Sequence, residues 1–411
     1  MMVIKFSNIL QAMEDYKQIK TLCQKNSDAT FKILDEFLLY YAAEKDKLGK
    51  EADRRLGTYR HITQKLDKSW YNLLKSQFII HKVMKKDGLV HKYLNHVALQ
   101  NRDPSQKEWL EEQSATPWRF SFAIIDEKVA EDFYRMLDVF TGENYLLYST
   151  SMSDTLKEGP RELWFNLIGF NGSCWQTYGP LAGYRSFGPD DIFFFATELN
   201  PSIADDEDLM ADVERNPVPY MMLFSGSDLP LTVHEAHPLV IALSELEGVS
   251  LEAKNLEKDF NHDYLNGVHK LSLKGWELQP HFSVAYYDET DHILQITALT
   301  EMGYLKLVEV LNTYEMDLDE VPDIQVKPSM LNTTGDILKR KIELMPYELL
   351  FESQQDPASE AELEKINHLM ELALPDINAG KMPDIDGLAK KVGLDSETTR
   401  EILEQVMGKL K

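Results

Sequence analysis

Histidines are the residues whose chemistry and spacing first suggest a site in this sequence. Six of the eleven lie between residues 234 and 292, and two of these, His234 and His237, are three positions apart. Imidazole nitrogens are common zinc ligands, and His262 or Asp263 could supply a third ligand. The spacing differs from the H-E-x-x-H motif of zinc proteases. We predict no metal here, and keep as an alternative a metal-dependent enzyme built on residues 234–292.

Nucleophilic catalysis finds little support in the residue pattern. The G-x-S-x-G motif of hydrolases is missing, and Gly172-Ser173-Cys174 is only a fragment of such a motif. Cys174 stands beside Trp175 in an expected strand, where a buried and unreactive thiol is the ordinary state. The other cysteine, Cys23, is expected in a different domain, so the pair predicts no disulfide framework. We predict no catalytic residue and no cofactor, and we expect that the protein is not an enzyme.

The segment 171–190 is the most unusual part of the chain, with four glycines, two prolines and several aromatic residues. Trp, Tyr and Arg are enriched at binding anchors, and glycine allows close approach of a backbone. We predict a partner-binding surface made of Trp175, Tyr178, Tyr184 and Arg185. The alternative, which the pattern favours, is a β-meander whose aromatic side chains fill a core.

Runs of aromatic and β-branched residues predict the strands of a central antiparallel sheet. Residues 133–140 and 145–150 should form a hairpin around the turn 141–144, and residues 192–196 another strand. Upstream, residues 6–100 have the apolar spacing of helices.

A second α+β unit follows the central sheet. Residues 281–287 and 292–298 read as the clearest hairpin in the chain, and residues 218–224 as a further strand. Thr300 should cap a helix over residues 301–312, and residues 316–332 read as a linker. The apolar positions of that helix are Leu305, Val308, Val310 and Leu311.

The residues from Ile385 to Leu403 resemble a helix-turn-helix. In that family a small residue precedes the turn glycine by four positions, as Ala389 precedes Gly393 here. The resemblance implies two helices meeting at a turn, but the second would present mainly acids, which repel a phosphate backbone. A three-helix protein-interaction module is therefore favoured over a DNA reader. Against the single base Arg400 the acids are Asp395, Glu397, Glu401 and Glu404.

Charge is unevenly distributed along the chain. Residues 1–103 carry 19 Lys and Arg against 12 Asp and Glu, whereas the remaining residues carry 24 against 56. The basic corner at Lys82, Lys85, Lys86 and Lys92 could contact nucleic acid. The favoured interpretation is that the basic part lies in solvent or docks on acids of the same chain.

The 411 residues exceed what one core organises, so we predict an α+β multidomain protein. The lack of a long apolar run argues against a membrane partner, and the two cysteines suit the cytoplasm. We predict a non-enzymatic protein-interaction or regulatory protein with a protein partner, or alternatively a nucleic-acid-associated one; the oligomeric state stays open. The expected domains are a basic helical domain (1–113), an aromatic-rich β domain (114–200), an α+β domain (201–332) and a helical C-terminal region (333–411) with a three-helix tail from 356.

Overall fold

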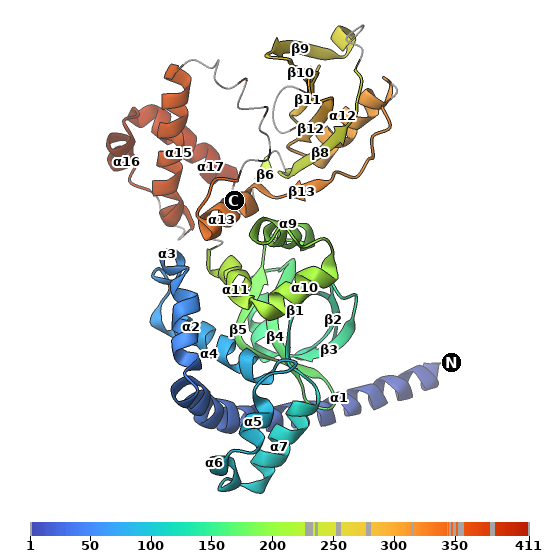
Figure 1. The fold of residues 1–411 in the computed structure, drawn as a ribbon, viewed down its shortest axis with the longest axis vertical. Helices are drawn as coiled ribbons and strands as arrows, with labels where there is room; N and C mark the ends of the chain where they lie inside the picture. Colours follow the sequence, from blue (N-terminus) through green and yellow to red (C-terminus); the bar gives the residue numbers. More distant parts are fainter. Residues whose placement is uncertain are drawn as a thin grey trace. The chain divides into compact units, whose positions relative to one another are not determined.

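The chain, seen here as a computed structural model, combines helices and β-sheets in two compact units (Figure 1). Residues 1–263 with 269–342 form the first unit, and residues 264–268 with 343–411 form the second. The structure describes residues 2–226, 233–234, 237–251, 256–276, 281–314, 316–342, 344, 347, 351, 357–378 and 383–409.

The N-terminal region is helical, as predicted. Its longest straight segment after the first helix is α4, which begins where the Asp67 carboxylate accepts the Trp70 amide at 2.9 Å. The buried face of α4 includes Leu74, Phe78 and Ile80. The elements are α1 (Met2–Thr30), η1 (Phe31–Leu38), η2 (Tyr41–Lys45), α2 (Leu48–Gly57), α3 (Arg60–Thr63), α4 (Lys68–Met84), α5 (Val90–Leu94), α6 (Val97–Gln100) and α7 (Pro104–Ala115).

The central sheet is a closed barrel, with strand order β1-β2-β3-β5-β4. It is not purely antiparallel, because β3 and β5 pair in parallel, with Leu147 opposite Trp175. This pairing gives β3 and β5 hydrogen-bonded neighbours and closes the sheet, so the barrel has no exposed edge. The strands are β1 (Arg119–Ala130), β2 (Phe133–Asp138), β3 (Asn144–Tyr148), β4 (Leu163–Phe170) and β5 (Trp175–Tyr184).

The predicted β2–β3 hairpin is confirmed, with Phe133 opposite Tyr148. Buried side chains of β1, β2, β3 and β4 meet in one cluster, and the half-buried Trp175 and Leu181 of β5 pack against it. Trp164 is its largest fully buried member, and Met152 joins it from α8 (Thr150–Lys157). The barrel interior is therefore a packed core.

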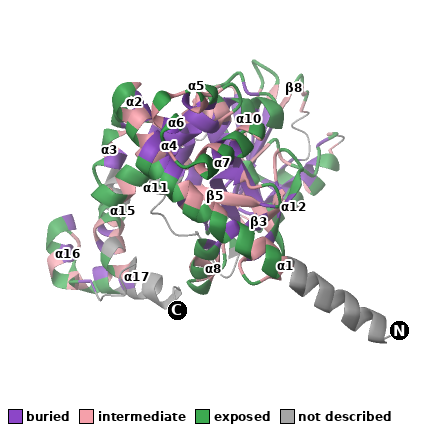
Figure 2. Cartoon of the chain, turned by 90° about the horizontal axis from the view of Figure 1, so that it is seen from below, coloured by how far each residue is buried: buried purple, intermediate pink, exposed green. Residues whose placement is uncertain are grey.

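The outer face of β1 and β4 is aromatic and covered by helices. Phe165 stacks on Phe122 with ring centroids 4.4 Å apart, and Tyr220 lies edge-on to Phe122 at 6.4 Å. His81 of α4 lies 4.8 Å from Phe120. Figure 2 shows buried residues gathered where helices meet the strands.

Residues 192–196 are helical and not the predicted strand. They belong to α9 (Pro189–Leu199), where the Asp191 carboxylate accepts the Gly188 amide at 2.8 Å. A cap and Pro at the first helical position outweigh the strand preference of three consecutive phenylalanines. Asp191 also accepts the Lys327 amide at 2.8 Å, which anchors β13 (Ile324–Val326) beside this helix.

Two further predictions in this part of the chain were wrong. Residues 218–224 lie in α11 (Pro217–Gly226), because a helix that is apolar all round has the same sequence pattern as a buried strand. The expected linker over 316–332 contains β13 and the start of α13 (Pro328–Leu338). Between α9 and α11 lies α10 (Asp206–Arg215).

The second sheet has six strands in the order β13-β8-β12-β11-β10-β9. The predicted hairpin is confirmed as β11–β12, with Ser283 opposite Ala298. The predicted helix is also confirmed: α12 (Glu301–Asn312) begins where Thr300 Oγ1 accepts the Gly303 amide at 3.0 Å. The other elements are β6 (Val233–His234), β7 (His237–Pro238), β8 (Ile241–Glu247), η3 (Leu256–Lys258), β9 (Phe260–Leu265), β10 (Val268–Leu273), β11 (Ser283–Asp288) and β12 (Ile293–Ala298).

Three helices in the described part of the second unit surround a small core. These are α15 (Pro357–Asn378), α16 (Ile385–Val392) and α17 (Ser396–Lys409). Gly393 ends α16 with φ of +72°, a conformation that glycine adopts without strain. The buried core residues are Leu369, Ala373, Leu388, Val392 and Leu403.

Candidate functional site

Trp175 lies half-buried at the start of β5, surrounded by side chains of neighbouring strands. The Arg119 guanidinium lies over its ring, 5.2 Å from the centroid. Phe170 and Tyr145 approach the same ring at 5.5 and 6.2 Å. The cation–π contact holds the indole at the barrel wall, with part of its surface open to solvent.

Tyr178 is half-buried further along β5 and contacts the N-terminal helices. Its hydroxyl donates to the Asp35 carboxylate of η1 at 2.7 Å, and its carbonyl accepts from the Gln77 side chain of α4 at 3.0 Å. Burial, followed by the nearby Asp35 carboxylate, raises the pKa of Tyr178. The ring lies 5.8 Å from Trp118. Tyr178 therefore joins helices to the barrel.

The remaining two predicted binding residues lie in different environments. Tyr184 is only 3% exposed and packs on Phe187 with centroids 5.6 Å apart, whereas Arg185 is exposed. The structure does not bring Trp175, Tyr178, Tyr184 and Arg185 onto one surface. Partner binding at the two half-buried aromatics stays a prediction.

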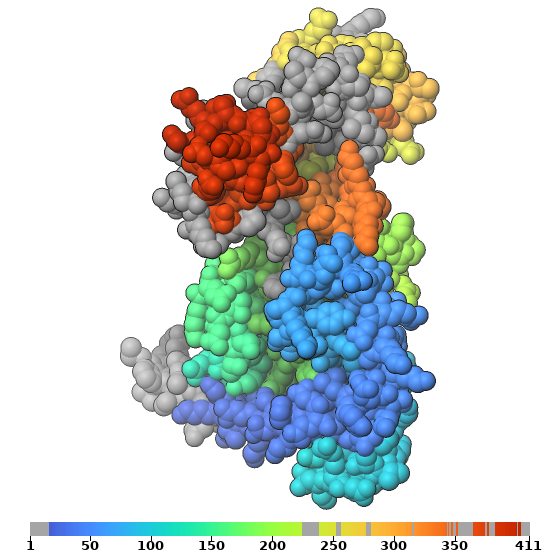
Figure 3. Space-filling model, turned by 90° about the vertical axis from the view of Figure 1, so that its left-hand side faces the viewer, coloured from blue at the N-terminus to red at the C-terminus, as the bar shows by residue number. Residues whose placement is uncertain are grey.

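Side chains of α1 and β5 meet around a hollow of about 220 Å³. We call this contact the α1–β5 seam, and it is formed by Asn26, Ser27, Trp118, Gln176 and Tyr178. Asn26 donates to the Gln176 side chain at 2.8 Å, and Gln176 donates to Ser27 Oγ at 3.1 Å. In Figure 3 the N-terminal residues (blue) lie across barrel residues (green) on the face shown. The amide contacts of this seam join α1 to β5.

The two cysteines come together beside this seam, although the sequence placed them in different domains. Cys23 of α1 and Cys174 before β5 are both buried, and their sulfur atoms are 3.2 Å apart. Their separation by 151 positions explains why no local pattern indicated the contact.

The basic residues of the N-terminal region contact acceptors within the chain. Lys85 Nζ donates to the Glu214 carbonyl at 2.9 Å, and His81 Nε2 lies 2.8 Å from the Glu214 carboxylate. The interpretation that the basic part docks on acids of the same chain stays a prediction. Further ion pairs join Lys82 to Glu51 and Lys92 to Asp46.

The histidine-rich region contains a hydrogen-bonded chain of side chains. His262 Nε2 lies 2.7 Å from His269 Nδ1, and His269 Nε2 lies 2.6 Å from the Glu289 carboxylate. Among the residues that the structure describes, no group of three or more His, Cys, Asp or Glu could hold a metal ion. His234 and His237 face one another in the β6–β7 pair, and their side chains lie outside the described part.

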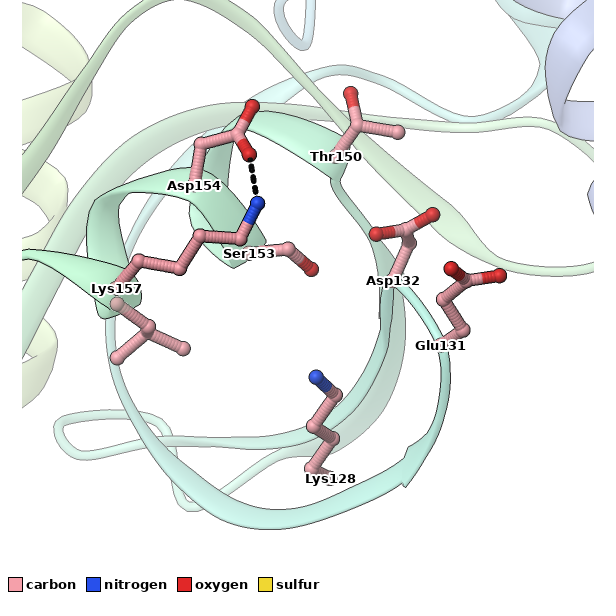
Figure 4. A pocket seen from close by; sticks show the side chains of 8 residues that line it. Lys128, Glu131, Asp132, Thr150, Ser153, Asp154 and Lys157 are labelled. Atoms are coloured by element: carbon pink, nitrogen blue, oxygen red, sulfur yellow. Dashed lines mark hydrogen bonds and ion pairs between the residues drawn. The ribbon is translucent and has the colours of Figure 1, made fainter.

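A polar hollow of about 430 Å³ lies beside α8 (Figure 4). Lys157 and Asp154 form an ion pair of 2.7 Å on one wall. Glu131 and Asp132 line the other wall. Lys20, which is not a lining residue, lies 3.0 Å from both carboxylates. These ion pairs satisfy much of its charge, so we assign it no ligand.

A hollow of about 610 Å³ lies along α12. We call it the α12 groove, and Trp276, Met302 and Leu305 supply its large apolar side chains. Met302 and Leu305 are 48% and 39% exposed. The sequence pattern predicted Leu305 as one of the apolar positions of this helix and did not indicate Met302; the three-residue spacing of the two was the available signal. Its other lining residues are Lys306, Val308, Glu309, Asn312 and Glu320.

Comparison of the chain with protein-family models, with curated proteins and with solved structures found no match. Among the described helices, none combines the length and apolar character needed to cross a lipid bilayer.

Proposed function

We propose that this is a non-enzymatic protein-interaction or regulatory protein, and that the α12 groove receives its partner. The observation that supports this proposal is the exposure of Met302 and Leu305 beside Trp276 in one hollow. Burying such a side chain contributes about 1.5–3 kcal/mol, so a partner that covers all three would gain substantially.

One side of α12 packs on the sheet, and another side is exposed and available for binding. Tyr304, Leu307 and Leu311 are buried against the six-stranded sheet and hold the helix in place. Met302 and Leu305 lie on another side, one turn apart, where they can serve as neighbouring anchors. An amphipathic helix places its own apolar residues at the same spacing, which suits a helix-in-groove complex.

The charges of the groove favour a basic partner. Among the described residues Glu309 and Glu320 line it with a single lysine, Lys306, which is already paired with Glu309 at 2.8 Å. Lysine or arginine beside the apolar residues of a partner would therefore meet uncompensated acid. We propose as the partner a basic amphipathic segment of another protein, in the cytoplasm.

The C-terminal helices offer a second surface of the same class. Because α16 and α17 resemble a helix-turn-helix with an acidic second helix, we propose that they contact protein and not DNA. Asp395 caps α17 by accepting the Thr398 amide at 2.8 Å, and Glu397 follows in its first turn. Both carboxylates would repel a phosphate backbone.

Selection of displayed random peptides on the full-length chain tests the proposed groove. We expect enriched peptides to carry apolar residues three or four positions apart, flanked by lysine or arginine. A second selection uses Leu305→Lys, which puts a charge into the apolar groove, and should lose these peptides. Val97→Lys is the matched control, because Val97 is 74% exposed on α6, outside the groove. Equal enrichment on Leu305→Lys, or no enrichment on the unaltered chain, would contradict the proposal.

A further inference from the structure

The buried thiols of Cys23 and Cys174 lie in direct contact. Their sulfur atoms lie 3.2 Å apart, hydrogen-bonded, within a buried cluster that includes Phe133 and Tyr148. A buried thiol without a partner behaves as a small inert hydrophobe. Two thiols in contact can instead react with one another once either is oxidised.

Asn171 organises this pair from the turn between β4 and β5. Its side-chain carbonyl accepts the amides of Ser173 and Cys174 at 3.0 and 2.9 Å, which fixes the turn. Its amide nitrogen lies 3.3 Å from the Cys23 sulfur and 3.6 Å from that of Cys174. One asparagine thus shapes the turn that carries Cys174 and donates to Cys23.

The hydrogen bonds distinguish the two sulfurs. The hydrogen bond from the Cys174 thiol lowers the pKa of Cys23. Burial opposes this shift, and the hydrogen bond from Asn171 adds to it. The same contact with Cys23, together with burial, raises the pKa of Cys174. A thiolate is the nucleophilic form, so Cys23 is suited to attack and Cys174 to remain protonated as the second thiol.

We propose that Cys23 and Cys174 are a peroxide-oxidised site that closes to an intramolecular disulfide. The Cys23 thiolate attacks one oxygen of hydrogen peroxide, the O–O bond breaks, and a sulfenic acid and hydroxide form. The Cys174 sulfur then attacks the sulfenic sulfur, the S–O bond breaks, and water leaves as the S–S bond forms. Overall, two thiols lose two electrons and two protons, and one peroxide becomes two waters.

The thiol pair lies next to an exposed turn, and a disulfide formed there would link two distant parts of the chain. Gly172 and Ser173, which directly precede the buried Cys174, are exposed, so solvent reaches the turn next to the thiol pair. The disulfide would join α1 covalently to the barrel across 151 positions of sequence. Closing so long a loop restricts the unfolded chain strongly.

Peptide mapping of the full-length chain after titration with hydrogen peroxide tests the site. We expect one cross-linked peptide containing both cysteines, lighter than its two components by two hydrogens, and its reversal by a dithiol reductant. The oxidised chain should melt about 5 °C higher than the reduced chain. Two free thiols in the denatured protein after excess peroxide, or a sulfinic acid at Cys23 without cross-link, would overturn the proposal.

Two variants separate reactivity from structure. Cys174→Ser removes the second thiol, so Cys23 should accumulate as a sulfenic acid that dimedone traps. Asn171→Asp keeps the acceptor that orders the turn but removes the donor to sulfur; the reaction at neutral pH should slow severalfold, because less of Cys23 is then thiolate. An unchanged rate in Asn171→Asp with native circular dichroism, or no trapped sulfenic acid in folded Cys174→Ser, would contradict the assignment.

Discussion

The α1–β5 seam and the α12 groove both contain large apolar side chains at a helix, but among the described residues they differ in burial: Trp118 of the seam is covered, whereas Met302 and Leu305 of the groove are exposed. At the seam, Trp118 is 3% exposed and donates its indole N–H to Gln113 at 3.1 Å. At the groove, Met302 is 48% exposed. Aromatic residues in a sequence therefore do not indicate a binding surface until the helices that cover them are known. Here the α12 groove, which has fewer aromatic residues than the seam, has the more exposed side chains.

The largest effect is expected from removing a seam side chain. Trp118→Ala should lower the free energy of unfolding by about 3–5 kcal/mol, because it removes a buried ring and leaves Gln113 without its donor. Denaturant unfolding of the full chain measures this. Leu305→Ala in the α12 groove is the comparison and should change stability by about 0.5 kcal/mol or less. Equal losses in both variants would remove the distinction between the two regions.

A smaller loss is expected from filling the space next to Trp118. A Cβ atom at Gly169 would lie 2.3 Å from the Trp118 ring, so Gly169→Ala must displace the indole and should cost about 1–3 kcal/mol. Gly57→Ala is the matched control, since a Cβ atom there meets nothing within 4 Å and alanine favours the helix. If thermal melting shows no difference between the two variants, the seam is packed more loosely than described.

The contact between α4 and the barrel should make the stability of the protein depend on pH. Burial lowers the pKa of His81 against the opposing influence of Glu214. Below about pH 6.5 the unfolded chain therefore binds more protons than the folded chain at this histidine. The free energy of unfolding is unaffected by His81 above that pH and falls as the pH falls below it, by at most about 1.4 kcal/mol per pH unit. His81→Gln does not titrate and should flatten this acid limb in urea unfolding measured from pH 7.5 to 5. An identical slope in the variant would contradict the assignment to His81.

The smallest effect is expected at the exposed end of the predicted binding segment. Arg185→Ala should change the melting temperature by about 1 °C or less, since Arg185 is exposed. Tyr184→Ala, one position earlier, should be destabilised by about 3–5 kcal/mol because the ring is buried. Comparable melting of both variants would contradict the difference in burial between the two side chains.

Local patterns in the sequence predicted the elements that local forces determine. The helix after Thr300 and the β11–β12 hairpin were found because a cap and an alternation of apolar residues lie within a few positions of one another. The phenylalanines at 193–195 were misassigned, because the cap at Asp191 competes with their strand preference and also depends on Lys327 far along the chain.

The features that matter most for the candidate sites depend on distant contacts. Barrel closure needs the parallel pairing of Leu147 with Trp175, and the thiol pair needs Cys23 to meet Cys174 across 151 positions. The exposure of Leu305 depends on what the rest of the chain leaves uncovered, which the spacing of apolar residues in one helix does not reveal.

The affinity of one selected basic amphipathic peptide for the full-length chain decides between binding in the α12 groove and binding at the start of β5. We expect Leu305→Lys to weaken binding roughly thirtyfold or more, as loss of a central anchor does, and Trp175→Ala to leave it unchanged. Fluorescence anisotropy of the labelled peptide gives both values under the same conditions. Loss of binding in Trp175→Ala with full binding in Leu305→Lys would contradict the account and place the partner at the start of β5.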